Sequence, residues 1–189
     1  MHPAEETLFW LSVFLYALTS IMYLLVYTQQ KNNLLRFARR LAVTAVITQA
    51  AVLALRTWLS GHIPFMRDYE NAVSMSFCMV IFYFLLVRKE KDFEGIGTLI
   101  FPITLLMLGY AATFSIGYEP LSPTLKTGWL YVHVIFSIVC FSAFALGAGM
   151  GLYYLILRHR RSATELLLRL NDRMYRIIIF GVCTHGISI

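Results

Sequence analysis

The chain alternates long apolar runs with short polar segments, and most runs have the length that crosses a bilayer. A helix needs ~20 apolar residues to span the hydrocarbon core, and the runs lack the strict alternation of a membrane β-strand. Because lipid offers no partners to backbone polar groups, continuous runs of this kind predict helices. The predicted spans, to within a few residues, are Thr7–Tyr27, Arg40–Leu59, Ala72–Val87, Ile96–Ile116, Thr127–Leu157, and a last one from about Met174 that is still apolar at Ile189.

Composition supports this interpretation. Of the 189 residues, 59% are hydrophobic and only 14% are charged, and the mean hydropathy is +0.68. We therefore predict an all-α fold, a polytopic integral membrane bundle of about six transmembrane helices with the last one incomplete. No internal repeat or linker divides the chain, so residues 1–189 are expected to form a single transmembrane domain.

The formal net charge of +6 is distributed in a way that indicates membrane orientation. Basic residues cluster in alternate loops, which by the positive-inside rule are cytoplasmic. This predicts a multi-pass protein of the cytoplasmic (inner) membrane, with the N-terminus and residues 61–71 and 117–126 outside, and excludes nucleic acid as a partner. The main basic residues are Lys31, Arg36, Arg39, Arg40, Arg88, Lys89, Lys91, Arg158, Arg160, Arg161, Arg169, Arg173 and Arg176.

Two shorter patterns carry structural expectations. Ser162–Arg173 combines leucines with charged residues, which predicts a short amphipathic helix on the cytoplasmic surface. Gly147 and Gly151 lie four residues apart in a predicted span, where small residues permit close helix packing.

Histidines at the outer ends of two spans are the main candidates for chemistry. His133 lies about one turn inside the fifth span, and a neutral imidazole at a membrane boundary suits an axial ligand of haem iron. Trp129, at i−4, shares its helical face and could stack on a porphyrin edge. His62 ends the second span on the same side, between Gly61 and Pro64. Each histidine also has an alternative interpretation. His133 could lie in an interfacial belt of aromatic residues and bond to a loop carbonyl. His62 could be an exposed residue of a helix-ending turn.

Three other polar residues within or beside the spans have two readings each. Arg56 lies inside an apolar run and either faces a partner or cavity, such as a haem propionate, or snorkels to the interface. Glu70 begins the third span, where it suits the helix dipole or pairs with Arg67 or Arg56. His185, in the last span, either bonds within the bundle or marks a second haem position.

Three segments, in order, resemble the motifs of one family. Arg56–Pro64 followed by Tyr69–Asn71 resembles an R…SGHxP…YES pattern, and Leu121–Leu125 followed by Trp129–Val134 resembles LxPxLxSxWLxxHV. Leu170–Ile178 resembles LDxLxYRxI. The chain, from about residue 56 to its end, is thus similar to the cytochrome c assembly family, specifically the CcsA/ResC-type membrane subunit of the System II cytochrome c synthase.

The resemblance implies haem handling in cytochrome c maturation. It assigns His133 as one axial, iron-coordinating ligand of a transiently bound b-type haem, with the other expected from sequence beyond Ile189. His62, Trp129 and Arg56, singled out above from the residues themselves, are the other predicted cofactor-binding residues. Haem would be presented at the outer face for covalent attachment to apocytochrome c, by a subunit of a cytochrome c haem lyase complex. Its partners would then be membrane lipid, haem, apocytochrome c and a second membrane subunit. The family's tryptophan-rich segment is expected after Ile189.

Other functions stay open. A transporter for another substrate would explain the helices and Arg56, but it gives no reason for the outer histidines. An electron-transferring membrane cytochrome b usually places histidine pairs deep within facing helices, whereas His62 and His133 lie near one surface. An inert truncation product is the third alternative. Whether the chain is an enzyme is not decided by its residues.

Overall fold

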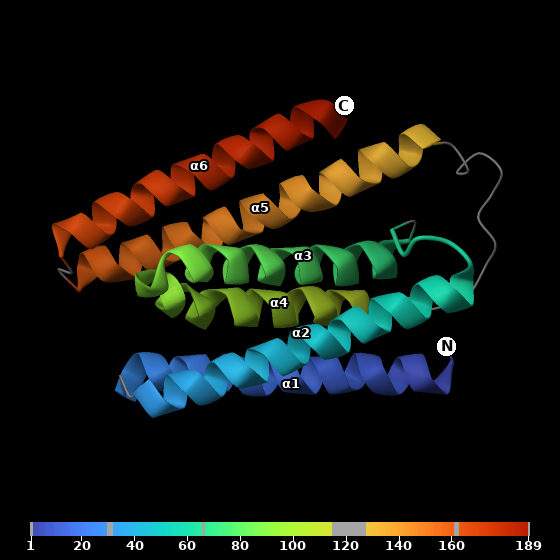
Figure 1. Ribbon diagram of the computed structural model, residues 1–189, viewed down its shortest axis with the longest axis horizontal. Coiled ribbons are helices and arrows are strands. Elements are labelled where there is room, and N and C mark those ends of the chain that lie inside the picture. Colours follow the sequence, from blue (N-terminus) through green and yellow to red (C-terminus); the bar gives the residue numbers. More distant parts are fainter. Residues whose placement is uncertain (1, 30–31, 66, 115–127, 161–162, 189) are drawn as a thin grey trace.

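The computed structural model describes residues 2–29, 32–65, 67–114, 128–160 and 163–188 (Figure 1). Every regular element in this part of the chain is helical, which confirms the predicted all-α class. The elements are α1 (Pro3–Gln29), α2 (Asn32–Ser60), α3 (Asp68–Lys89), the short 3-10 helix η1 (Lys91–Ile96), α4 (Gly97–Ala111), α5 (Gly128–His159) and α6 (Thr164–Ser188).

The described helices include five segments long and apolar enough to cross a membrane, so the chain is a multi-pass membrane protein. They are α1, α2, α3, η1 together with α4, and α5. The predicted sixth span corresponds to the second half of α6, which is not one of the five. The first half of α6 is too polar to be part of a membrane span, because Arg169, Asp172 and Arg173 follow one another closely there.

Successive helices run antiparallel and pack as three hairpins, α1–α2, α3–α4 and α5–α6 (Figure 1). The α3–α4 hairpin lies between the other two, since α4 packs on α1 and α3 packs on α5. The N-terminus, the end of α2 and the starts of α3 and α5 therefore gather at one end of the bundle, and the basic turns gather at the other. We call these the histidine-bearing end (residues 60–65, 67–70, 128–133 and 185–188) and the basic end (residues 36–40, 88–94, 158–160 and 163–176).

Apart from the start of α6, two predicted helix boundaries differ from the structure by five residues or more. The second helix begins at Asn32 rather than Arg40, because Leu35 and the fully buried Ala38 give this stretch an apolar face against the core. The fourth helix ends at Ala111 rather than Ile116, where the chain tightens into i→i−3 hydrogen bonds from Thr113 and Phe114. Residues 115–127, including the predicted outer loop 117–126, lie outside the described part of the chain.

The prediction of a separate amphipathic surface helix at Ser162–Arg173 was wrong. The stretch from Thr164 belongs to the continuous helix α6, because its apolar stripe packs against protein and Leu170 is fully buried. Among the described residues, three ion pairs hold this half of α6 to the turn after α3, at 2.8 Å from Arg169 to Asp92, 3.7 Å from Arg169 to Glu90 and 2.7 Å from Arg173 to Glu90.

Small residues let the helices approach closely. A Cβ atom added at Gly147 would lie 3.2 Å from Ile178 of α6, and one added at Gly151 would lie 3.5 Å from Met174 of α6. The predicted packing face is therefore confirmed. Gly97, at the start of α4, is tighter still, and there the phenol rings of Tyr23 and Tyr83 occupy the space that a side chain would need.

Buried polar groups join α1, α2 and α3 at mid-bundle. Tyr16 donates to Gln49 Oε1 at 2.6 Å, and the Gln49 amide donates to Val73 O at 3.0 Å and to Ser76 Oγ at 2.8 Å. A polar group in lipid needs such partners, so these contacts set the register of the three helices.

Gly97→Ala should destabilise the bundle by about 1–3 kcal/mol, the usual cost of overpacking a core. Its Cβ would lie 2.5 Å from Tyr23 and 2.6 Å from Tyr83, both of which are buried rings. Gly109→Ala is the matched control on the same helix, because nothing lies within 4 Å of its added Cβ. Unfolding in mixed detergent–SDS micelles would measure both, and equal stability of the two variants would contradict the packing described.

Candidate functional site

The loop after α2 forms a tight helix-ending turn, as predicted. Gly61 adopts a φ of 69°, in the left-handed region that other residues resist, and its N–H donates to Thr57 O at 3.1 Å. Pro64 is buried, and its carbonyl accepts a hydrogen bond from Ser74 Oγ of α3 at 3.0 Å. The turn is therefore held at both sides, which fixes the position of His62 between them.

The imidazole of His62 is half-buried, and its Nδ1 lies 3.0 Å from the carbonyl oxygen of Ile63. A carbonyl only accepts hydrogen bonds, so Nδ1 must carry the proton. When the ring is neutral, the lone pair then resides on Nε2, which is the tautomer that a metal-binding imidazole uses when it bonds through Nε2.

His133 is in the same tautomeric state for the same reason. It lies in the second turn of α5, which begins at Gly128, and its Nδ1 bonds to the carbonyl oxygen of Ser188 at the end of α6. The predicted alternative, a bond to a loop carbonyl, is thus replaced by a bond to a neighbouring helix. The residue is exposed, and Trp129, one turn earlier, is 64% exposed.

His185 lies beside this contact. Its Nδ1 is 3.3 Å from Ser188 Oγ, and its ring centroid is 6.3 Å from that of Phe141 on α5. The hydrogen-bond contact of His185 is thus made within its own helix, and the side chain is exposed. His133 and His185 both approach Ser188, so the start of α5 and the end of α6 form one polar group.

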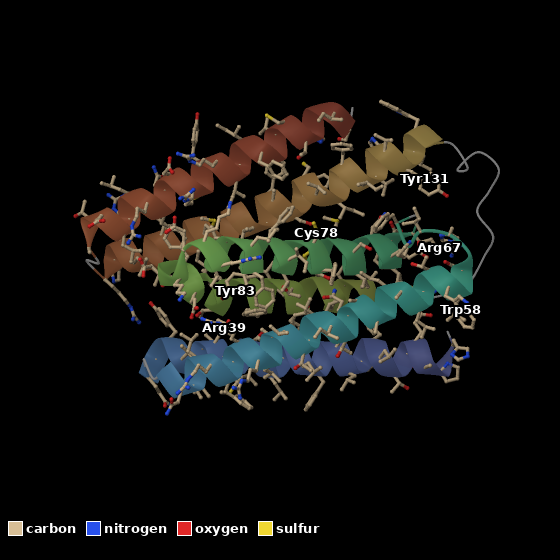
Figure 2. The ribbon with its side chains drawn as sticks, viewed as in Figure 1. Arg39, Trp58, Arg67, Cys78, Tyr83 and Tyr131 are labelled. Carbon is tan, nitrogen blue, oxygen red and sulfur yellow. The ribbon has the colours of Figure 1, made fainter. Side chains whose placement is uncertain are left out.

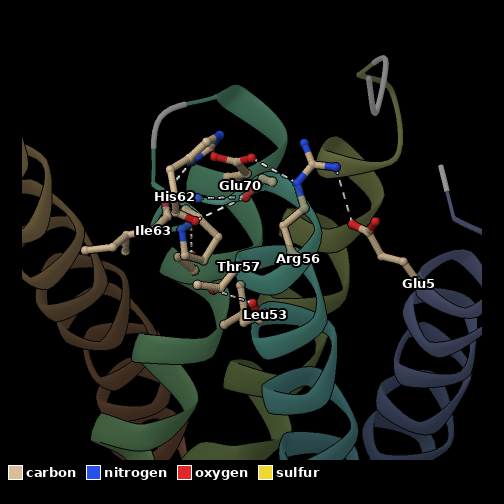
Figure 3. A network of polar contacts seen from close by, with 10 residues as sticks. Glu5, Leu53, Arg56, Thr57, His62, Ile63 and Glu70 are labelled. Carbon is tan, nitrogen blue, oxygen red and sulfur yellow. Dashed lines mark hydrogen bonds and ion pairs between the residues drawn. The ribbon is translucent and has the colours of Figure 1, made fainter. Parts of the chain in front are cut away.

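Arg56 belongs to a second group at the same end, drawn in Figure 3. Its side chain is 2% exposed, which rules out snorkelling. Its Nε lies 2.9 Å from Glu70 Oε1, and a terminal guanidinium nitrogen lies 3.5 Å from Glu5 Oε1. The predicted pairing of Glu70 with Arg56 is confirmed. Both carboxylates are themselves fully buried, and Tyr69 adds a ring 5.5 Å from the guanidinium carbon.

Sequence reasoning missed Glu5 as a partner of Arg56. The available signal was an acidic residue in the first turn of an apolar helix, at the end of the bundle where an intramembrane arginine also falls. The cluster joins α1, α2 and α3 and lies one turn before the Ser60–Pro64 turn. It therefore supports the loop that carries His62.

The structure brings all four predicted site residues to one end of the bundle but in two groups. Figure 2 shows Trp58, Arg67 and Tyr131 at this end and Arg39 at the opposite one. Among the described residues, His62 bonds within its own loop and His133 bonds to α6, and no hydrogen bond joins the two groups. The described chain also contains no cluster of three or more His, Cys, Asp or Glu that could enclose a metal ion.

These features define a polytopic helical membrane protein with imidazoles at one end. A family model described as "Cytochrome C assembly protein" matches residues 66–189. The chain belongs to this family. Curated relatives named "Cytochrome c biogenesis protein CcsA" include that of Mesostigma viride, 28% identical over 76% of this chain and 48% of the relative.

The corresponding protein of Chlamydomonas reinhardtii is 31% identical over 69% of this chain and 40% of its own length. That of Trieres chinensis is 24% identical over 77% and 47%. The chain therefore spans two-fifths to one-half of the length of these relatives, and resembles CcsA along that part.

Arg56→Ala should destabilise the fold strongly, by about 3–5 kcal/mol, because it leaves two buried carboxylates without their arginine. Arg40→Ala, an exposed position on the same helix, is the control and should change stability little. Replacing all three charges together, with Glu5→Gln, Arg56→Met and Glu70→Gln, should recover most of the loss. SDS titration in mixed micelles measures each variant, and a triple variant as unstable as Arg56→Ala would contradict the assignment.

Proposed function

We propose that the protein handles haem in cytochrome c biogenesis, binding it at the outer face of the membrane and presenting it for covalent attachment to apocytochrome c. The observation that carries the proposal is the state of His133. Its Nδ1 is engaged by Ser188 O, so Nε2 is available on an exposed side chain at a bundle end. Family membership supports the proposal, because the matched relatives are named for cytochrome c biogenesis.

The residues at this end fit a haem as substrate. Haem iron takes one or two axial ligands, so a single accessible imidazole is sufficient, and the lack of a larger ligand cluster among the described residues is compatible with it. His133 would be the axial ligand, and Trp129 would offer an apolar face to the porphyrin. When bound, haem supplies the groups that form thioether bonds with the cysteines of apocytochrome c.

His62 and Arg56 have different parts in this proposal. His62 has a free Nε2 and remains a candidate contact to haem. Arg56 would contribute to haem binding only indirectly, because its buried guanidinium contacts Glu70 and Glu5. It would hold the loop of His62 in place, and through that loop contribute to the haem site.

The wider assignments rest on the same proposal. The basic end would face the cytoplasm and the histidine-bearing end the outside, with the N-terminus outside and the protein in the cytoplasmic membrane. The haem would be b-type and transiently bound, and the partners would be apocytochrome c and a second membrane subunit of a haem lyase complex. A cytochrome b is less favoured, since His62, His133 and His185 all lie towards one end of the bundle.

His133→Gly should lower the haem absorbance of the purified protein by about tenfold or more, because the iron loses its axial ligand. It should also abolish maturation of c-type cytochromes in cells. His159→Gly is the matched control, since it removes a histidine from the other end of the same helix. Added imidazole should restore absorbance to His133→Gly, because it can occupy the vacated position. Retention of both haem and maturation in His133→Gly would contradict the ligand assignment.

A membrane-impermeant maleimide should label Ile63→Cys in intact cells, whereas Arg160→Cys should react only after the cells are opened. Both positions are exposed, and they lie at opposite ends of the bundle. The protein without either substitution gives the background from Cys78, Cys140 and Cys183. The reverse labelling pattern would overturn the orientation, and with it the outer position of His133.

A further inference from the structure

A groove of about 360 Å³ lies between α3, α5 and α6 at the basic end, at the opposite end of the bundle from His62 and His133. Its rim carries three cations, Lys89 of α3 and Arg173 and Arg176 of α6. Its walls are apolar and include Phe82 and Ile177. The groove thus combines a positively charged mouth with an apolar interior.

The two parts of the groove are separated along the helix axes. Phe82 lies seven residues before Lys89, which is about 10 Å along a helix, towards the middle of the bundle. Phe180 lies one turn beyond Arg176 in the same direction. The Phe82 and Phe180 rings meet edge to face at 6.1 Å between centroids and link α3 to α6. An occupant would therefore place its charge at the bundle end and its apolar part at membrane depth.

The cations of the rim are only partly neutralised by the protein. Arg173 bonds through one guanidinium nitrogen to Glu90 at 2.7 Å, and Arg176 bonds through Nε to Asp172 at 2.9 Å. Among the described residues, Lys89 has no carboxylate partner. Three cations against two carboxylates leave a net positive charge, and both arginines keep further N–H groups that can donate to an anion.

We propose that this groove binds an anionic phospholipid, with the phosphate at Lys89, Arg173 and Arg176 and an acyl chain along Phe82, Ile177 and Phe180. Basic pockets between transmembrane helices on the cytoplasmic side suit anionic headgroups. The apolar walls favour a lipid over a water-soluble anion, because a free phosphate would leave them without an occupant. The lipid would help seat the polar half of α6 against α3 and α5.

The test is native mass spectrometry of the protein released from detergent containing equal amounts of phosphatidylglycerol and phosphatidylcholine. Phosphatidylglycerol should be retained preferentially. Lys89→Gln combined with Arg176→Gln should weaken its retention roughly tenfold or more, since each cation near an anionic headgroup contributes substantially. Both side chains are exposed, so the core is left unchanged.

Arg88→Gln combined with Arg158→Gln is the matched control. It removes the same charge from exposed positions at the same end that do not line the groove, and should change retention less than twofold. Lys89→Arg combined with Arg176→Lys should retain the lipid, because it preserves both charges.

Four results would overturn the proposal. They are equal retention of the two lipids, equal loss in the test and control variants, displacement of phosphatidylglycerol by inorganic phosphate at matching concentration, and loss of haem instead of lipid from the test variant. The last would show that the groove takes a different amphipathic anion. None depends on the outer histidines, so a failed haem proposal would be distinguishable.

Discussion

The buried ion cluster of Arg56, Glu70 and Glu5 is the constraint on which the histidine-bearing end depends. In lipid, apolar side chains gain little by contacting one another rather than acyl chains, so burial of apolar surface does not choose a helix register. A buried arginine does, because it must meet its carboxylates within hydrogen-bond distance. Here the nitrogen–oxygen distances are 2.9 and 3.5 Å, and they bring together three helices from three parts of the chain.

The same helices are joined a second time at greater depth, through Gln49, Tyr16 and Ser76. Two polar junctions along α2, separated by two turns, fix its rotation as well as its position. The position of α2 in turn fixes where the turn after it begins, and Gly61 and the hydrogen bond from Ser74 to Pro64 hold that turn against α3. The position of the loop that carries His62 thus depends on contacts between the helices as well as on hydrogen bonds within the loop.

The five long spans and their order could be predicted from the sequence, because span length is a local property. Boundaries were less accessible, since the first turns of α2 and all of α6 depend on partners elsewhere. In the sequence, Ala38 is one alanine within a basic stretch, and only the structure shows that it is fully buried. The site residues divide in the same way. The order of the loops predicted which end of the bundle carries the site residues. The contacts of Arg56 with Glu5 and of His133 with Ser188 could not be predicted, because they join residues far apart in sequence and no local pattern specifies them.

The family match begins at residue 66, so it contains Glu70 and His133 but neither Arg56 nor Glu5. The ion cluster therefore crosses the limit of the matched region. Glu70 is fully buried, and Arg56 brings a positive charge to it from α2, outside the matched region. Helices α1 and α2 therefore contribute buried polar contacts to the matched region and are not merely attached to it. They supply the charge and the carboxylate that allow α3 to begin where it does, next to the loop of His62.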